Sequence, residues 1–144
     1  MQERFQAFVT GISVCYKYIQ KIKTVEMTEF GLKGAHAMCL FFLQNHPEGI
    51  TAAQLSHLCA EDKAAVSRSL ADLAEKGYVE SEEKKYRSRI RLTERGKEVA
   101  DHIDEMIDQW VSFGGDGLTE ENREIFYKSL GLIAQNLHDK VEKL

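Results

Sequence analysis

Basic side chains in the second half of this chain recur at a spacing suited to binding a polyanion. Arg87, Arg89 and Arg91 occupy every second position, so in an extended strand they point to one face. Like charges on one face repel one another unless a polyanion or buried acids lie beside them. Lys84 and Lys85 precede them in a polar turn. Because arginine suits bidentate phosphate contact and narrow minor grooves, this segment predicts contact with nucleic acid.

The net charge of −4 hides two regions of opposite sign. Residues 84–97 hold seven basic side chains and one acid, a local charge of +6. Residues 98–144 hold four basic side chains and eleven acids, a local charge of −7. Affinity for phosphates follows the local field and not the total charge, so the division predicts a basic working face on an acidic body.

Two short helices joined by a tight turn precede the basic segment. In the first helix, Thr51 and Gln54 have the spacing of a capping box, in which each side chain satisfies a backbone N–H at the helix start. The apolar positions predict that this helix buries Leu55 and Leu58. Residues 59–61 then form the turn.

The second helix is expected to begin after Asp62, a suitable N-cap, and to end at Gly77, where a left-handed residue closes it. Its apolar residues keep to one inward face by a four-then-three spacing: Val66, Leu70 and Leu73. Two short strands follow, with Tyr78 and Val79 in the first and Ile90 and Leu92 in the second, joined by the polar turn 82–87. Thr93 is expected to cap the next helix.

The outward face of the second helix carries side chains suited to reading DNA. A helix-turn-helix places the first turns of its second helix at base edges. Lys63, Ser67 and Arg68 can donate hydrogen bonds to guanine or phosphate, and Ala64 is small enough for close approach. Alone, these residues favour an ordinary solvated helix face. The basic hairpin beside them favours DNA binding by a helix and a wing together.

The segment from residue 50 to residue 96 resembles the winged-helix regulators of the multiple-antibiotic-resistance regulator (MarR) family. The resemblance rests on ITAAQLSHLCAEDKAAVSRSLADLAEKGYVE followed by RIRLTERGKEVA, with its characteristic Leu92-Thr93-x-x-Gly96 ending. It implies that the recognition helix lies in the major groove and that the wing reaches the adjacent minor groove. The recognition-helix residues are Lys63, Ala64, Ser67 and Arg68, and the wing residues are Lys84, Lys85, Arg87 and Arg89.

Two departures from the family pattern limit what the resemblance implies. The family wing often carries an Asp-Arg-Arg signature on a longer loop, whereas this chain has Lys84-Lys85-Tyr86 on a shorter one. The shorter loop favours phosphate contact over deep insertion into the minor groove. The start of the recognition helix also lacks the family's usual Arg or Thr, so no operator sequence can be carried over.

The predicted fold is mainly α with a small β-wing, a winged helix-turn-helix flanked by dimerisation helices. We expect an N-terminal dimerisation helix in residues 1–34, a DNA-binding lobe in residues 35–96 and C-terminal dimerisation helices in residues 97–144. The resemblance implies a homodimer, and large apolar residues in both terminal stripes agree with an interface. They include Phe5, Phe8, Ile125, Phe126, Ile133 and Leu137. A two-fold dimer predicts an inverted-repeat operator.

Family members commonly bind small phenolic or other lipophilic effectors, and Tyr16, His36, Met38 and Trp110 could line such a pocket. Each of them is more simply explained as a core or dimer-packing residue. Some relatives sense peroxides through a cysteine near the N-terminus, and Cys15 lies in that helix. The three cysteines show no C-x-x-C and the five histidines no H-x-x-H spacing, so neither a disulfide framework nor a metal site is predicted.

These features together predict a sequence-specific DNA-binding transcriptional regulator, a ligand-responsive repressor that acts as a homodimer on double-stranded DNA. The alternatives are a winged-helix module for protein–protein interaction and a peroxide-sensing regulator using Cys15. No Gly-rich phosphate loop, nucleophile elbow or metal-hydrolase motif supports an enzyme, and no cofactor is expected. Without an apolar run of membrane-spanning length or a secretory signal, the expected location is the cytoplasm.

Overall fold

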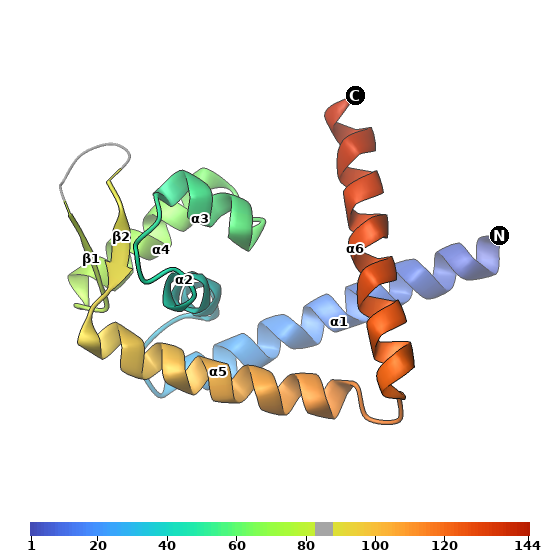
Figure 1. The fold of residues 1–144 in the computed structure, drawn as a ribbon, viewed down its shortest axis with the longest axis horizontal. Coiled ribbons are helices and arrows are strands. Elements are labelled where there is room, and N and C mark those ends of the chain that lie inside the picture. The colour runs from blue at the N-terminus through green and yellow to red at the C-terminus, as the bar shows by residue number, and fades with distance from the viewer. Residues whose placement is uncertain (83–87) are drawn as a thin grey trace. The chain divides into compact units, whose positions relative to one another are not determined.

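The computed structural model describes residues 1–82 and 88–144 and is mainly helical, with one small antiparallel sheet (Figure 1). It divides into two compact units, residues 1–106 and residues 107–144. The mainly α fold with a β-wing is therefore confirmed. In chain order the elements are α1 (Gln2–Thr28), α2 (Gly34–Gln44), α3 (Ala52–Cys59), α4 (Lys63–Glu75), β1 (Val79–Ser81), β2 (Ile90–Leu92), α5 (Glu94–Gly114) and α6 (Glu120–Glu142).

Helix α2 is the centre of the first unit. It packs against α1, α3, α4 and β2, and in Figure 1 it is enclosed by these elements. Apolar residues on nearly all its sides, among them Leu40 and Leu43, are removed from solvent. The side chains that close around them come from every other element of this unit and include Met27, Leu55, Leu73 and Ile103. A helix that is apolar all round is stable only when it is buried in this way.

The helix-turn-helix begins with the predicted caps. The Thr51 Oγ accepts a hydrogen bond from the Gln54 backbone N–H at 3.2 Å, and the Gln54 Oε1 accepts one from the Thr51 N–H at 2.9 Å. The Asp62 carboxylate accepts from the Ala65 N–H at 2.7 Å and starts α4. Between the two helices Ala60 adopts a left-handed conformation, with φ of 53°.

The sequence predicted that α3 buries both Leu55 and Leu58, and the prediction for Leu58 is wrong. Leu55 is fully buried, whereas Leu58 is 37% exposed. The reason is the length of α3, which is only eight residues long, so its inward stripe ends soon after Leu55. Leu58 lines a shallow hollow on the outer side of the helix instead.

The wing is a two-stranded sheet extended by one residue from the loop before α3. In β1 and β2, Val79 pairs with Leu92 and Ser81 with Ile90. Ile50 forms an isolated antiparallel bridge with Ile90, closed by hydrogen bonds of 2.8 and 3.2 Å. This bridge attaches the wing directly to the start of the helix-turn-helix. The predicted tip residues Lys84, Lys85 and Arg87 lie outside the described residues.

The first turn of α5 lies close against the backbone of Tyr78. The Thr93 hydroxyl donates to the Gly77 carbonyl at 2.6 Å and accepts from the Gly96 N–H at 3.1 Å, so it caps α5 as predicted. A Cβ added to Gly96 would lie 2.0 Å from the Tyr78 carbonyl oxygen. Gly77 itself has φ of +81°, the left-handed end that the sequence predicts for α4. The Thr93-x-x-Gly96 spacing therefore fastens α5 to the end of α4.

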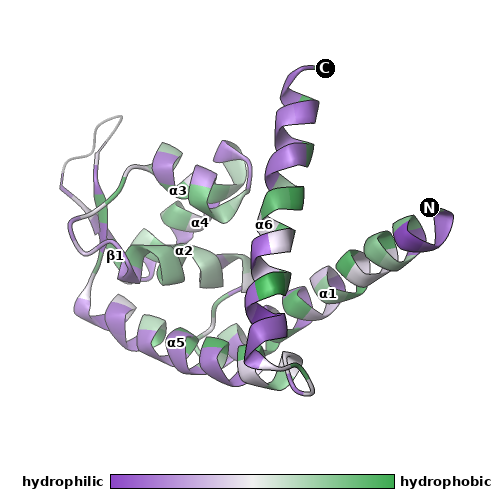
Figure 2. Ribbon diagram, turned by 45° about the vertical axis from the view of Figure 1, so that its right-hand side comes forward, coloured by the Kyte–Doolittle hydropathy of each residue, from purple (hydrophilic) through white to green (hydrophobic). Residues whose placement is uncertain are grey.

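The second unit comprises the end of α5, a glycine-containing turn and α6. Thr119 caps α6 through a hydrogen bond from the Asn122 N–H, as its sequence predicts. None of the residues of α6 is buried within the chain. Helix α1 likewise leaves its N-terminal two-thirds exposed, and Figure 2 shows hydrophobic residues along both helices. The exposed apolar residues include Phe5, Ile12, Ile19, Phe126, Ile133 and Leu137.

We predict that Gly96→Ala destabilises the protein because its methyl group collides with the Tyr78 carbonyl. Overpacking of this kind costs about 1–3 kcal/mol, which exceeds the gain of up to about 1 kcal/mol in helix propensity. Urea unfolding followed by circular dichroism measures the change.

The matched control is Gly131→Ala, which lies inside α6 and has nothing within 4 Å of the new methyl group. Here only the propensity term remains, so the stability should rise or stay unchanged. Equal midpoints for the two variants would contradict the close approach at Gly96.

Candidate nucleic-acid interface

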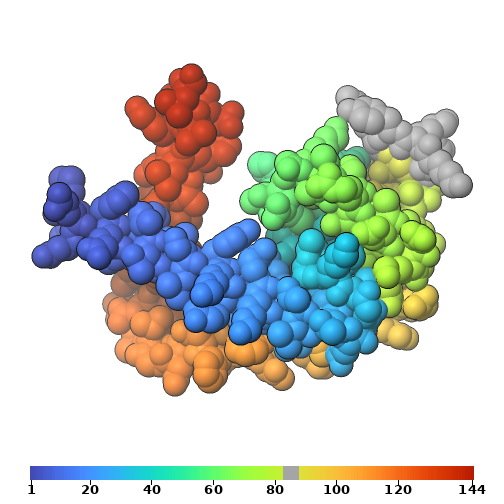
Figure 3. Space-filling view, turned by 180° about the vertical axis from the view of Figure 1, so that it is seen from behind, coloured from blue at the N-terminus to red at the C-terminus, as the bar shows by residue number. Residues whose placement is uncertain are grey.

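Helix α4 has a buried face and an exposed face, divided as the sequence predicts. Lys63, Ala64, Ser67 and Arg68 are all exposed, and the opposite face buries Val66, Ser69, Leu70 and Leu73. Figure 3 shows the surface of α3 and α4 open to solvent. Ala71 is also exposed, one turn after Ser67. It was not among the recognition-helix residues predicted from the sequence, although the helical period alone could have identified it.

Small side chains along this face allow a partner to approach the helix axis closely. Ala64, Ser67 and Ala71 follow one another at three- and four-residue spacing on the exposed side. Lys63 and Arg68 flank them and supply long cationic side chains. A narrow ridge of small residues between cations is suited to a groove lined by phosphates.

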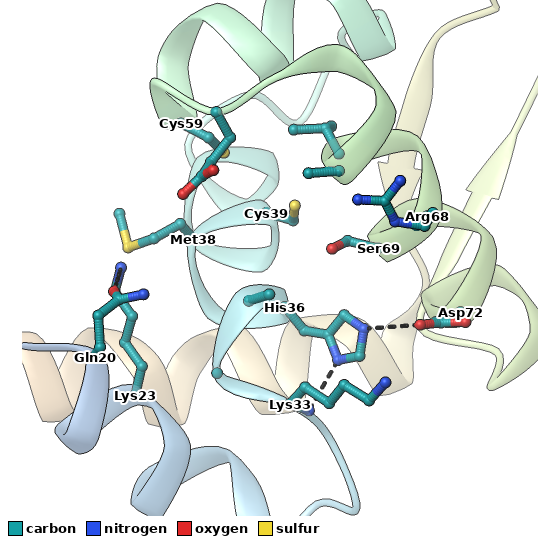
Figure 4. Close-up of a pocket in the computed structure, with 15 residues that line it drawn as sticks. Gln20, Lys23, Lys33, His36, Met38, Cys39, Cys59, Arg68, Ser69 and Asp72 are labelled. Atoms are coloured by element: carbon teal, nitrogen blue, oxygen red, sulfur yellow. Dashed lines mark hydrogen bonds and ion pairs between the residues drawn. The ribbon is translucent and has the colours of Figure 1, made fainter.

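A buried histidine ties the middle of α4 to α2. The His36 side chain is 2% exposed, and its Nε2 lies 3.4 Å from the Asp72 carboxylate (Figure 4). Its Nδ1 accepts a hydrogen bond from the Lys33 backbone N–H at 3.0 Å. With Nδ1 as the acceptor, the neutral imidazole carries its proton on Nε2 and donates it toward Asp72. Burial lowers the His36 pKa from 6.5, although Asp72 opposes the shift.

The end of α4 is tied to α5 through one arginine. The Arg95 guanidinium donates to the Lys76 carbonyl at 2.9 Å and lies 4.8 Å from the centre of the Tyr78 ring. These contacts lie beside the hydrogen bond from the Thr93 hydroxyl to the Gly77 carbonyl. The exposed face of α4 is thus held by polar ties at Asp72 and at its C-terminal end.

The alternating arginines of the wing have different roles. Arg91 donates to the Glu48 carbonyl through Nε and Nη2, at 3.2 and 3.0 Å, and forms an ion pair with Glu82. It therefore braces the loop before α3, and an acid relieves its charge. Arg89 is exposed, while Arg87 lies outside the described residues. Among the two arginines that the structure describes here, Arg91 is paired with Glu82, and Arg89 is the one exposed to a phosphate.

Arg89 borders a hollow between α3 and β2. Gln54, His57 and Leu58 line the other side, and its volume is about 600 Å³. Gly49, with φ of +88°, lies at its floor, where a Cβ would come within 3.1 Å of Arg89 and Arg91. Donors from α3 and from the wing thus face the same open space. Gln54 and His57 were not among the DNA-contacting residues predicted from the sequence, because only the folded chain brings them beside Arg89.

The residues suggested for an effector pocket do not all lie together. His36 and Met38 line a cavity of about 310 Å³ bordered by α1, α2, α4 and the turn after α3 (Figure 4). Tyr16 is exposed on α1, and Trp110 belongs to the second unit. Neither of these two lines the cavity. The four-residue pocket stays a prediction.

The suggested redox residue Cys15 is exposed on α1. The neighbouring Lys17 ammonium lies over the Tyr18 ring, 5.6 Å from its centre. In residues 1–82 and 88–144 there is no group of three or more His, Cys, Asp or Glu side chains that could hold a metal ion. No helix in this described part has the length and apolar character needed to cross a membrane.

Comparisons with known proteins agree with this geometry. The model of the MarR family matches residues 30–89. A MarR transcriptional regulator from Methanosarcina mazei Go1 is 23% identical with a TM-score of 0.80, covering 92% of this chain and 91% of that one. A putative MarR family transcriptional regulator from Listeria monocytogenes, solved with a 26mer DNA, is 19% identical with a TM-score of 0.85, covering 92% and 89%.

The transcriptional regulator SlyA is 21% identical with a TM-score of 0.84, covering 92% of this chain and 95% of that one. No curated protein matches the sequence. The similarity to the solved structures extends over nearly the whole chain and shows a shared fold.

We predict that acid weakens the fold through His36. Because its pKa is lowered in the folded protein, the unfolded chain binds the proton more readily, so this stabilisation is complete above pH 6.5. It is lost as the pH falls from 6.5 through the lowered pKa of the folded state. His36→Gln retains an acceptor for the Lys33 N–H but does not titrate, so the variant should have a shallower dependence of unfolding free energy on pH. Urea unfolding between pH 7 and pH 5 measures the slope.

The matched control is His57→Gln, the same substitution at a histidine that is exposed on α3, and its slope is compared with those of the wild type and of His36→Gln. An unchanged slope in His36→Gln would show that the buried imidazole is not the group responsible.

Proposed function

We propose that this chain is a DNA-binding transcriptional regulator of the MarR family, whose model matches its winged-helix region. The main support is the exposed face of α4, where Ala64 and Ser67 form a narrow ridge flanked by Lys63 and Arg68. The ties from Asp72 to His36 and from α5 to the end of α4 pre-organise that face. A rigid reading helix loses little freedom on binding, which favours affinity.

In this proposal α4 enters the major groove and the wing contacts the backbone. Arg89 binds phosphate, together with Gln54 and His57 from α3 across the shared hollow. Lys84, Lys85 and Arg87 extend the positive field at the wing tip. Lys84, Lys85, Arg87 and Arg89 are the basic residues of the wing that support this assignment on a protein that is acidic overall.

The proposed active form is a homodimer. Helices α1 and α6 carry aromatic and aliphatic side chains that their own chain leaves uncovered, with Phe5 69% and Phe126 50% exposed. Exposed apolar stripes of this kind mark an interface. Two copies related by a two-fold axis would present two α4 helices to an inverted repeat.

We further propose that the protein is a repressor released by a small lipophilic or phenolic effector. The support is the cavity beside His36 and Met38, which extends to Arg68, Ser69 and Asp72 of α4. A ligand that binds one arrangement of α4 more tightly than another shifts the population of DNA-competent protein. The alternative, a protein–protein module with the same fold, predicts no affinity for duplex DNA.

We predict different effects for two arginine variants on DNA binding. Arg89→Ala removes a phosphate contact, so it should weaken binding to all duplexes and lower the salt slope by about 1 per contact. Arg68→Ala should cost about 1–3 kcal/mol and also relax the preference at particular base pairs. Fluorescence anisotropy with a cognate and a random duplex at several salt concentrations measures both effects.

Lys128→Ala, an exposed charge change on α6, is the control and should bind as the wild type does. If the wild type fails to bind even random duplex at low salt, the DNA-binding proposal is wrong and the protein-interaction module takes its place.

We predict that the purified protein sediments at twice its 16.4 kDa mass. Phe126→Asp places a charge in the apolar stripe of α6 and should raise the dimer dissociation constant by about thirtyfold or more, the effect of losing an interface anchor worth 2 kcal/mol. Lys128→Ala serves again as the matched surface change. Sedimentation of the wild type as a monomer at micromolar concentration would contradict the dimer.

A further inference from the structure

Two histidines line the hollow between α3 and β2. His46 follows the end of α2 and is partly exposed, and His57 is exposed in the last turn of α3. Both border the same open space as Glu48, Gln54 and Arg89. Histidine is the side chain whose charge ordinarily changes between pH 5 and 8, whereas arginine keeps its charge. The hollow therefore joins one permanent cation to two imidazoles that gain or lose a proton near neutral pH.

A hydrogen bond fixes the tautomer of the neutral His46 ring. Its Nδ1 lies 2.8 Å from the carbonyl oxygen of Phe42. A carbonyl oxygen only accepts hydrogen bonds, so Nδ1 carries the proton and Nε2 is left as an acceptor. Since His46 lines the hollow, the neutral ring brings a lone pair to this space and no second donor.

Protonation reverses the chemistry of Nε2 without disturbing the rest of the ring. The His46 imidazolium still donates from Nδ1 to the Phe42 carbonyl, and it gains an N–H at Nε2. A bare Nε2 and a phosphate oxygen are both acceptors, so they cannot bond. A protonated Nε2 donates to phosphate through a charge-assisted hydrogen bond. This change requires no movement of the backbone.

His57 provides the second imidazole from the opposite side of the hollow. It is the basic residue in the last turn of α3, where a positive charge interacts favourably with the carbonyl end of the helix. Its neighbour in the hollow is Gln54, whose side-chain oxygen accepts from the Thr51 N–H at 2.9 Å. The amide group of Gln54 is thereby left as a donor. Protonated His57 adds further donors to the same wall.

The remaining charged groups of the hollow set its net charge. Glu48 and Arg89 are its other ionisable lining residues, and they balance one another when both imidazoles are neutral. Arg91 holds the loop below through the Glu48 carbonyl, and its charge is paired with Glu82. Protonation of both imidazoles therefore changes the hollow from neutral to doubly positive. A phosphate beside Arg89 is bound more tightly in the second state.

We propose that the hollow is a phosphodiester site controlled by protonation of His46 and His57, so that binding of DNA takes up protons. The inference rests on the proposed function, because the phosphodiester is that of the DNA backbone beside the wing. It adds regulation to that function. The bound protein holds more protons than the free protein, and linkage then makes the dissociation constant fall as the pH falls.

The test is fluorescence anisotropy with a random duplex at fixed ionic strength, between about pH 8 and about pH 6, the range over which imidazoles change charge. We expect the wild type to bind roughly tenfold more tightly at the acid end, since each histidine takes up as much as one proton. The slope of log K against log salt should steepen by about 0.9 for each histidine that becomes cationic. Circular dichroism at each pH verifies that the protein remains folded.

His46→Asn separates the two nitrogens of the ring. The asparagine amide can replace Nδ1 as the donor to the Phe42 carbonyl, but nothing replaces Nε2. The gain in affinity on acidification should be smaller than in the wild type. His57→Gln should reduce the gain likewise, and the double variant should bind almost equally across the pH range. His138→Gln is the matched control on α6, since this exposed histidine does not line the hollow and should keep the wild-type gain.

The outcomes separate the inference from the proposed function. Wild type that binds duplex DNA with the same affinity at every pH overturns the proton-controlled site and leaves the regulator intact. A double variant that keeps the full gain does the same. Wild type that binds no duplex at any pH refutes the regulator, and the site falls with it.

Nitrogen NMR of the free protein tests the geometry at His46 without DNA. The neutral ring should carry its proton on Nδ1, as the bond to the Phe42 carbonyl requires. A proton on Nε2 of the neutral ring would overturn the role of His46, because Nε2 would then be a donor at every pH.

Discussion

The contact between the first turn of α5 and the backbone of Tyr78 holds the winged-helix lobe together. Only a glycine permits it, since a Cβ at Gly96 would lie 2.0 Å from the Tyr78 carbonyl oxygen. Thr93 bonds to the carbonyl of Gly77 and to the N–H of Gly96, and Arg95 reaches the Lys76 carbonyl. The end of α4, the start of the wing and the start of α5 are thereby fixed within one short segment.

The polar side chains of the lobe fall into two sets. Some hold its elements together, and others are exposed at its surface. His36 and Asp72 tie α4 to the central helix, and Arg91 holds the loop before α3 through Glu48 and Glu82. Lys63 and Arg68 are exposed on α4, and Arg89 is exposed beside the hollow of α3. Satisfied polar groups pre-organise the lobe, so the exposed ones can bind a polyanion without a large rearrangement.

Local sequence signals predicted the elements well because they act within a few residues. The caps at Thr51, Asp62, Thr93 and Thr119 are all present, since each is a side chain bonding a backbone group nearby. Helical periodicity also separated the two faces of α4. It failed at Leu58, because the burial of a short helix depends on where its neighbours end. The partners of Arg91 were equally hidden, since Glu48 lies 43 positions away.

By itself the sequence determined the helices, the turn, the strands and the surplus of positive charge, all of which follow from periodicity and short-range hydrogen bonding. Tertiary structure alone decided which side chains meet. It placed His36 against Asp72, put Arg89 across a hollow from His57 and brought Cys39 and Cys59 to the lining of one cavity. In sequence those cysteines were two widely spaced thiols. They line the same cavity because α2 lies against α3, a contact set by packing of the whole core and not by any local pattern.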